Sequence, residues 1–270
     1  MNFIEAIFLG VVQGVTEFLP VSSSGHLLLA RQLLGIQQEA QAAFIFDVLI
    51  QLGTWIAILI YYRKDLLAIA ADMWRGLRGQ PAPQARLGWL LGLATVPAVI
   101  AGWLIKDAMT GEVSALLLTG VFLLINALLL AVAEWLGHRF RQIKDATVLD
   151  AVWIGTFQAA ALLPAVSRSA ATLAGGMMRN FTRPEAARFA FLLAVPIMPA
   201  AAAVALFDLG SLPSAGGLLL PLGIGFIVST IVGYLSIRWL LNYLSRHSSL
   251  PFALYCVAVG VAAIFISLAS

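Results

Sequence analysis

Long apolar segments dominate the pattern of hydrophobic and polar positions along the chain. A transmembrane helix needs about 20 consecutive residues that are mostly apolar. Segments of this kind occupy residues 43–62, 87–105, 115–136, 184–207, 218–241 and 250–268. With 61% hydrophobic and only 11% charged residues, the chain is far more apolar than a soluble domain. The sequence therefore predicts an all-α integral membrane protein with six simple crossings.

Two other apolar stretches, residues 3–34 and 151–178, are interrupted midway. The first contains the segment PVSSSGH and the second contains PAVSRSA, and both combine proline with small polar residues. Neither stretch therefore has the form of a simple span. The first stretch also lacks the basic start of a signal peptide and carries Glu17 and Pro20 inside its apolar run, so we expect it to be retained.

The basic residues are distributed unequally among the connections between these segments. Thirteen of the 16 Lys and Arg residues fall on one side of the membrane, which predicts that this side is the cytoplasm and that both termini lie outside. These residues are Arg63, Lys64, Arg75, Arg78, Arg86, Arg139, Arg141, Lys144, Arg179, Arg183, Arg188, Arg238 and Arg246. Arg31 and Lys106 fall on the other side, and Arg168 lies within the second interrupted stretch. The net charge of +3 thus reflects membrane orientation, and no nucleic-acid partner is expected.

This distribution also predicts the path of the two interrupted stretches. Residues 3–34 must enter and leave on the outer side and residues 151–178 on the cytoplasmic side, as re-entrant helical hairpins. Each hairpin precedes three crossings, so repeat one (about 1–136) and repeat two (about 151–270) are inverted-topology repeats within a single membrane domain, 1–270. Weak internal similarity agrees, because Gly10-Val-Val-Gln13 recurs as Gly155-Thr-Phe-Gln158. Residues 75–86 are the one soluble excursion and are too short to fold.

The tips of the two hairpins are predicted to meet near the membrane midplane. Broken helices leave backbone N–H and C=O groups unpaired, so the tips must be buried in protein or line a wet cavity. The polar residues that they bring together are Glu17, Ser22, Ser23, Ser24 and His26 from the first hairpin, and Ser167, Arg168, Ser169 and Thr172 from the second. The sequence therefore predicts a polar site in an apolar shell.

Each of these residues also has a structural interpretation. A carboxylate such as Glu17 is costly in an apolar hairpin unless it is used, whereas His26 could simply bind neighbouring backbone and the serines could cap helix ends. Arg168 either binds an anion or forms a structural pair with Glu17. An arginine fork, hydroxyls and helix N-termini favour a phosphate group over a carboxylate or a cation. The single cysteine, Cys256, excludes a disulfide framework and reads as a small buried hydrophobe.

Two segments of the chain resemble the signatures of a known family. Gln13-Gly-Val-Thr-Glu17-Phe-Leu-Pro-Val-Ser-Ser-Ser-Gly-His26 is similar to the first signature of the undecaprenyl-diphosphate phosphatase family of the bacitracin-resistance type. Pro164-Ala-Val-Ser167-Arg168-Ser169-Ala-Ala-Thr172 resembles its second signature. The resemblance extends to residues 46–53, 95–100 and 191–196, and thus covers essentially the whole chain.

The resemblance implies hydrolysis of undecaprenyl diphosphate to undecaprenyl phosphate and inorganic phosphate, which recycles the lipid carrier of cell-wall polymers and gives bacitracin resistance. It implies a multi-pass protein of the bacterial plasma (inner) membrane, an active site that opens to the outer face, and a divalent cation, Mg²⁺ or Ca²⁺. Carried over by position, the catalytic residues are Glu17, Ser23, His26 and Arg168. The substrate-binding residues are Ser22, Ser24, Gly25, Ser167, Ser169 and Thr172, and the metal ligands are Glu17 and Gln13.

The chain departs from the family signatures at three positions. Gln13 stands where the first signature has a glutamate, although an amide oxygen can still coordinate a metal ion. Ala165 and Ala170 stand where the second signature has glycines. If either position requires a positive φ or a close backbone approach, alanine costs about 1 kcal/mol or more.

Two questions remain open at the level of sequence. A polyprenyl-phosphate transporter or flippase is the alternative function, because inverted repeats with broken helices are typical of transporters. The nucleophile is Ser23 with His26 as its base, or His26 itself, or water, and helical spacing would place Ser23 and His26 on one face. The oligomeric state is also open, with a homodimer among the candidates.

Overall fold

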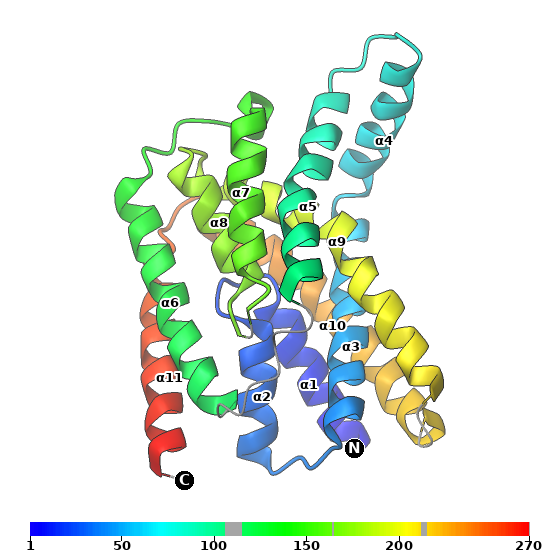
Figure 1. Cartoon of the computed structure of the whole chain (residues 1–270), viewed down its shortest axis with the longest axis vertical. Helices are drawn as coiled ribbons and strands as arrows, with labels where there is room; N and C mark the ends of the chain where they lie inside the picture. Colours follow the sequence, from blue (N-terminus) through cyan, green and yellow to red (C-terminus); the bar gives the residue numbers. More distant parts are fainter. Residues whose placement is uncertain (106–114, 164, 212–214, 270) are drawn as a thin grey trace.

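The computed structural model describes residues 1–105, 115–163, 165–211 and 215–269. Lys106, Pro164 and Ser270, which the sequence interpretation used, lie outside these residues. The described residues form helices and connecting loops without any β-strand (Figure 1). The helices are α1 (Phe3–Thr16), α2 (Ser23–Leu34), α3 (Ala40–Tyr61), α4 (Arg63–Leu77), α5 (Ala85–Ile105), α6 (Ala115–Leu136), the 3₁₀ turn η1 (Ile143–Asp145), α7 (Val148–Ala160), α8 (Arg168–Met178), α9 (Arg183–Ser211), α10 (Ala215–Leu244) and α11 (Leu250–Ala269).

Five helices are long and apolar enough to cross a membrane, namely α3, α5, α6, α10 and α11. They coincide with five of the six predicted crossings, with ends that differ by a few residues. The sixth predicted crossing, 184–207, lies within the 29-residue helix α9 but is not among these five. The chain is therefore an all-helical integral membrane protein.

Helix α4 corrects the interpretation of the connection after the first crossing. Residues 75–77 end this helix and residues 85–86 begin α5, so only residues 78–84 remain as a loop. The helix forms because Leu66, Ile69 and Met73 recur at helical spacing and pack against the hydrophobic core. The buried carboxylate of Asp72 also accepts a 3.0 Å hydrogen bond from the backbone N–H of Gln84, which fixes the loop. The tip of the α4–α5 pair projects beyond the other helices (Figure 1).

Two pairs of short helices interrupt the series of long ones. Helices α1 and α2 have 14 and 12 residues, and α7 and α8 have 13 and 11. Each is at most about 21 Å long, which is shorter than the roughly 30 Å hydrocarbon core of a bilayer. Serine side chains begin the second helix of each pair, because Ser22 Oγ accepts from the N–H of Gly25 and Ser167 Oγ accepts from that of Ala170.

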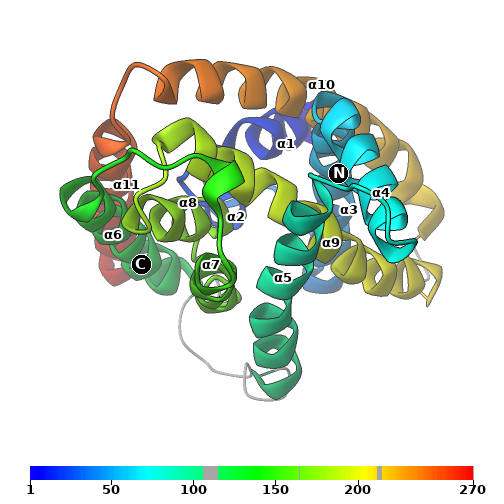
Figure 2. The ribbon, with the colours of Figure 1, turned by 90° about the horizontal axis from the view of Figure 1, so that it is seen from above.

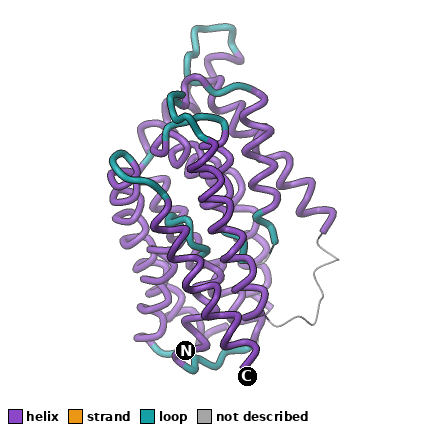
Figure 3. The backbone as a smooth tube through the Cα atoms, turned by 90° about the vertical axis from the view of Figure 1, so that its left-hand side faces the viewer, coloured by secondary structure: helices purple, strands orange, loops and turns teal. Residues whose placement is uncertain are grey.

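The two hairpins approach each other from opposite ends of the molecule. The α1–α2 pair lies at the end that holds both termini, and the α7–α8 pair lies at the other end, together with the loops that follow α4 and α6 (Figure 1). The turns of the two hairpins lie about halfway along the bundle, where they appear as loop segments between helices (Figure 3). The fold thus brings the two interrupted segments of the sequence to one place.

Each hairpin packs closely against a long helix from the other half of the chain. Helix α1 packs along α10, and α7 packs along α5 (Figure 2). A Cβ atom on Gly14 would come within 2.9 Å of the backbone nitrogen of Gly233, and one on Gly155 within 2.4 Å of the carbonyl oxygen of Ala94. Glycine is therefore required at both contacts. Such close approach between backbones is typical of helix packing in membranes.

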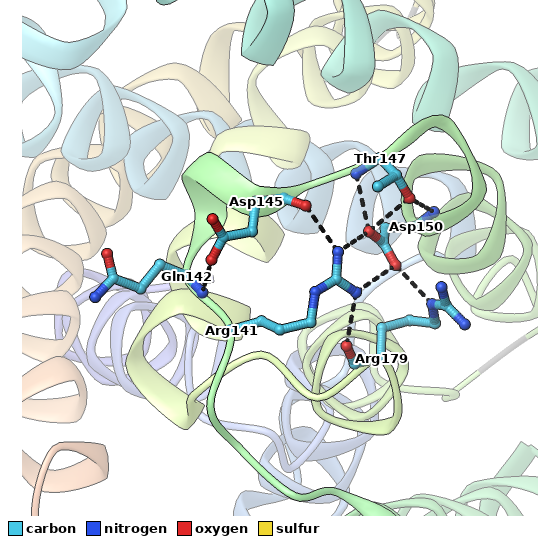
Figure 4. Close-up of polar contacts among 6 residues, drawn as sticks. All are labelled: Arg141, Gln142, Asp145, Thr147, Asp150 and Arg179. Atoms are coloured by element: carbon cyan, nitrogen blue, oxygen red, sulfur yellow. Dashed lines mark hydrogen bonds and ion pairs between the residues drawn. The ribbon is translucent and has the colours of Figure 1, made fainter.

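An ionic cluster fixes the base of the second hairpin (Figure 4). The fully buried Asp150, near the start of α7, accepts from Arg141 at 2.6 Å and from Arg179, at the end of α8, also at 2.6 Å. Thr147 completes a capping box with Asp150 at the start of α7. Burial alone would raise the pKa of Asp150, but these hydrogen bonds hold it well below its usual range. The cluster therefore joins both ends of the hairpin to the preceding loop.

Candidate active site

A cavity of about 360 Å³ lies where the two hairpin turns meet. Its walls come from both hairpins and from α3 and α9. The polar residues that line it are Gln13, Glu17, Ser22, Ser23, Ser24, Asp47, Gln51, Gln158, Ser167, Arg168 and Ser169, and the apolar wall includes Leu27, Phe44, Val48, Leu162, Val166, Ile197 and Met198. Most of the residues selected from the sequence thus share one cavity, which both polar and apolar side chains line.

Glu17 is the centre of the hydrogen-bond network in this cavity. Its side chain is 3% exposed and forms an ion pair with Arg168 of the opposite hairpin. Ser23 Oγ donates to Glu17 Oε2 at 2.8 Å, and Gln13 Nε2 donates to the same oxygen at 2.9 Å. Gln51 Nε2, from α3, donates to Oε1 at 3.3 Å. The buried carboxylate is therefore surrounded by donors from four helices, α1, α2, α3 and α8, as its burial requires.

Arg168 begins α8 and extends from the second hairpin toward the first. Of the two interpretations made from the sequence, the structure contains the pair with Glu17. Only Nη2 is used in this pair, and the other guanidinium nitrogens have no hydrogen-bond partner among the described residues. The side chain is 20% exposed and lines the cavity, so these N–H groups are available to an anionic ligand.

Further contacts tie the second hairpin's turn to its surroundings. Ser169 Oγ donates to the carbonyl oxygen of Leu19 at 2.9 Å, which joins the two turns directly. Asn126 of α6, a residue that the sequence analysis missed, accepts from the backbone N–H of Ser167 at 3.1 Å. Its Nδ2 also donates to the carbonyl oxygen of Ala165 at 3.4 Å. A lone asparagine in the middle of an apolar span was the available signal for this role.

His26 is held away from the cavity. Its Nδ1 lies 2.7 Å from the carbonyl oxygen of Ser22, and its Nε2 lies 2.8 Å from the hydroxyl of Tyr255 on α11, against which the ring is stacked. His26 has no hydrogen bond to Ser23 or Glu17. Tyr255 was not identified from the sequence, because it lies 229 residues further along the chain.

Gly25 and Thr172, two of the predicted substrate-binding residues, also do not line the cavity. A Cβ atom on Gly25 would come within 3.1 Å of Thr119 Cγ2, so its small size permits packing against α6. The hydroxyl of the buried Thr172 donates to the carbonyl oxygen of Arg168 within α8 at 2.7 Å. Gly25 therefore contributes to packing between α2 and α6, and Thr172 contributes a hydrogen bond within α8, outside the cavity.

The two alanines at expected glycine positions differ in conformation. Ala165 has a φ of +60°, in the left-handed region that favours glycine. An alanine there costs about 1–2 kcal/mol relative to glycine in the same conformation. Ala170 instead lies in the first turn of α8, where its N–H donates to Ser167 Oγ at 3.1 Å. Ala165 therefore adopts the positive φ that would favour a glycine, and it is strained. Ala170 has helical backbone, so glycine is not needed for its conformation.

The side chains around Glu17 offer oxygen ligands of the kind that a hard divalent cation prefers. These are the carboxylate of Glu17, the amide oxygens of Gln13 and Gln51, and the hydroxyls of the serines. In the part of the chain that the structure describes, no group of three or more His, Cys, Asp or Glu residues is arranged to hold a metal ion. A cation that takes Glu17 together with amide, hydroxyl and substrate oxygens fits this donor set.

The fold and this cavity define a polytopic helical membrane protein with a buried polar site between two hairpins. Residues 6–262 match the family model described as "Bacitracin resistance protein BacA". The chain belongs to this family.

Curated relatives cover almost the whole chain. It is 40% identical to a protein of Chlorobium phaeobacteroides named "Undecaprenyl-diphosphatase", over 97% of this chain and 95% of the relative. Proteins with the same name from Rubrobacter xylanophilus and Micrococcus luteus are 40% and 38% identical, each over 96% of this chain and over 96% and 95% of the relative.

Proposed function

We propose that this protein hydrolyses undecaprenyl diphosphate to undecaprenyl phosphate and inorganic phosphate. The observation that carries the proposal is the agreement between relatives of that name at about 40% identity, which cover nearly the whole chain, and the cavity that contains both signature segments. The reaction recycles a lipid carrier for cell-wall synthesis and gives resistance to bacitracin. The alternative of a transporter or flippase is not favoured, because the relatives carry the name of a hydrolase.

We propose that the cavity binds the diphosphate group. Helices α2 and α8 both begin at its wall, and their N-termini carry partial positive charge. Arg168 supplies charged donors in a fork that matches a phosphate, and hydroxyls of Ser22, Ser24, Ser167 and Ser169 line the same wall. The apolar residues of the wall, such as Phe44 and Val48, suit the isoprenoid chain attached to the diphosphate.

The mechanism that we propose uses Ser23 as the nucleophile. Its hydroxyl already donates to Glu17, so the carboxylate lies within the reach required of a base. Ser23 Oγ would attack the terminal phosphorus, the bond to the bridging oxygen would break, and undecaprenyl phosphate would leave. Water would then hydrolyse the phosphoserine and release inorganic phosphate. Arg168 would stabilise the negative charge that develops on the transferred phosphoryl group.

His26 remains the alternative nucleophile or proton shuttle. Either role requires its ring to leave Ser22 and Tyr255, since both ring nitrogens are engaged there. Rapid quench of the turnover mixture distinguishes the mechanisms. An acid-stable adduct would identify phosphoserine, an acid-labile adduct would identify phosphohistidine, and no adduct would favour direct attack by water.

A divalent cation, Mg²⁺ or Ca²⁺, would be held by Glu17 and Gln13. When bound, it would neutralise charge on the phosphate oxygens and make the phosphorus more electrophilic. Because Glu17 would be the only carboxylate ligand of the pair, we expect the substrate's own oxygens to complete the coordination.

We propose that the chain is one membrane domain, 1–270, made of two inverted repeats, with both hairpins re-entrant. The opposed hairpins and their reciprocal packing on α10 and α5 support this arrangement. We place the protein in the bacterial inner membrane with α4 and the loops after α4 and α6 in the cytoplasm. Arg63, Lys64, Arg75 and Arg78 lie in α4 or directly after it, and the loop after α6 carries Arg139, Arg141 and Lys144. The cavity would open to the outer face, and a homodimer is compatible with this placement.

The test is phosphate release from undecaprenyl diphosphate by the purified protein in detergent. The wild type should release phosphate, and Glu17→Gln, which keeps the size of the side chain, should reduce the rate at least about 10²-fold. A wild-type protein that binds the lipid without releasing phosphate would refute the proposed activity. Equal rates for the two proteins would instead refute the role of Glu17.

A further inference from the structure

Gln158 is a buried residue of the cavity wall that none of the roles above uses. It lies near the end of α7, the residue is 2% exposed, and it lines the same cavity as Glu17 and Arg168. Both Oε1 and Nε2 are buried without a hydrogen-bond partner among the described residues. A buried amide without partners costs free energy, so it calls for an explanation in a native protein.

Comparison with the first hairpin supports a role in ligand binding. Gln13 occupies the corresponding position of α1, since Gly10-Val-Val-Gln13 parallels Gly155-Thr-Phe-Gln158. Both amides are buried and line one cavity, but Gln13 is satisfied by Glu17, whereas the second hairpin has no carboxylate at the equivalent distance. The described residues of the second hairpin therefore supply no acceptor for Nε2 of Gln158. Because Gln158 lines the cavity, a ligand bound in the cavity is the source of an acceptor.

We infer that Gln158 is a substrate-binding residue whose Nε2 donates a hydrogen bond to a phosphate oxygen of the diphosphate. This inference rests on the proposed use of the cavity as the diphosphate site. A phosphate oxygen fits the donor Nε2, and Arg168 lines the same cavity with further donors for the same anion. Gln158 would thus hold the phosphate from the second hairpin, while the residues around Glu17 act from the first.

Two substitutions distinguish a role of Gln158 in phosphate binding from a structural role. Gln158→Met keeps the length of the side chain but removes both polar atoms, and Gln158→Glu keeps the shape but replaces the donor with a negatively charged oxygen. The assay is the thermal unfolding midpoint of the full-length protein in detergent, titrated with inorganic pyrophosphate as the probe. Thr156→Val is the matched control, since Thr156 is an exposed residue of α7 whose hydroxyl bonds only within its own helix.

We expect Gln158→Met to be at least as stable as the wild type without pyrophosphate and to bind pyrophosphate at least 10-fold more weakly. Gln158→Glu should bind at least 100-fold more weakly because its charge repels the phosphate. Wild-type affinity in Gln158→Met, or equal or tighter binding in Gln158→Glu, would overturn the inference. A loss of stability in pyrophosphate-free Gln158→Met would do so as well, because it would indicate a structural partner.

Arg168→Lys distinguishes this inference from the proposed site. If Arg168→Lys weakens pyrophosphate binding but Gln158→Met does not, only the role of Gln158 is refuted. If neither change affects binding, the cavity is not the diphosphate site and the inference falls with it.

Discussion

Replacement of Asn126 by alanine should destabilise the protein and displace the second hairpin's turn. The side chain is fully buried in α6 and holds the turn by two hydrogen bonds, from Ser167 N–H at 3.1 Å and to Ala165 O at 3.4 Å. Loss of the first bond leaves a buried N–H unsatisfied, at about 1–3 kcal/mol. Loss of the longer bond and of side-chain packing adds about 1 kcal/mol. The free energy of unfolding should therefore fall by about 2–4 kcal/mol.

Catalysis should fall as well, because Ser167 and Arg168 begin the helix that this turn positions. A displacement of about 1 Å at a reacting centre costs about 10²-fold in rate, so we expect kcat/KM for undecaprenyl diphosphate to decrease by that order. Unfolding can be followed by tryptophan fluorescence in mixed detergent, with phosphate release measured on the same preparation. Asn126→Leu fills the space but leaves the backbone N–H of Ser167 unpaired. It should therefore lower the free energy of unfolding almost as much as Asn126→Ala does.

Thr119→Val is the control for this experiment. Thr119 is as buried as Asn126 and lies on the same helix, but its hydroxyl donates only to Ala115 O at 2.8 Å within α6. Its replacement should change stability by no more than about 1 kcal/mol. If Asn126→Ala matched Thr119→Val in both stability and kcat/KM, the reasoning that Asn126 positions the turn would be refuted.

Three further predictions follow from the described contacts. Arg168→Lys keeps the charge but loses the fork, so kcat/KM should fall at least about 10²-fold with little change in stability, and full activity would reduce Arg168 to a diffuse positive charge. Asp150→Asn should lower the free energy of unfolding by about 2–4 kcal/mol at neutral pH, because it leaves two arginines without their partner. Since the folded-state pKa of Asp150 is depressed, its contribution is present above about pH 4 and is lost as the pH falls toward the folded pKa, so the two proteins should converge in acid unfolding curves. Single cysteines at Gln37 and Gln80, in a Cys256→Ala background, should be labelled from opposite sides of the membrane, and labelling from one side would contradict the orientation.

The sequence predicted the parts of the fold that depend on local pattern. The interrupted stretches became two hairpins because PVSSSGH and PAVSRSA supply helix-ending and helix-capping residues, and these effects act within a few positions. Burial of Cys256, whose sulfur lies 3.7 Å from the carbonyl oxygen of Pro20, was also confirmed. Helix α4 is not evident from hydropathy alone, because its charged residues resemble those of a loop, although its apolar residues have helical spacing.

The partners of the site residues could not be predicted in the same way. His26 was expected to face Ser23 because of helical spacing, but its position is decided by Tyr255 from the last helix, which no local pattern specifies. Asn126 and Gln51 likewise reach the site from long helices that pack around the hairpins. Which side chain satisfies a buried polar group depends on tertiary packing, and a single sequence gives little information about it.

The reciprocal packing of each hairpin on the other half of the chain has a consequence for biosynthesis. Helix α1 is made first, but the glycine-rich face of α10 that covers Gly14 follows more than 200 residues later. At about 5–20 residues per second, that delay is roughly 10–40 s. During this interval the broken first hairpin lacks its partner, and lipid cannot satisfy the polar groups of its turn. The first hairpin therefore gains its long packing partner only near the end of synthesis. A nascent chain that stops before α10 contains both signature segments but lacks the helix along which α1 packs.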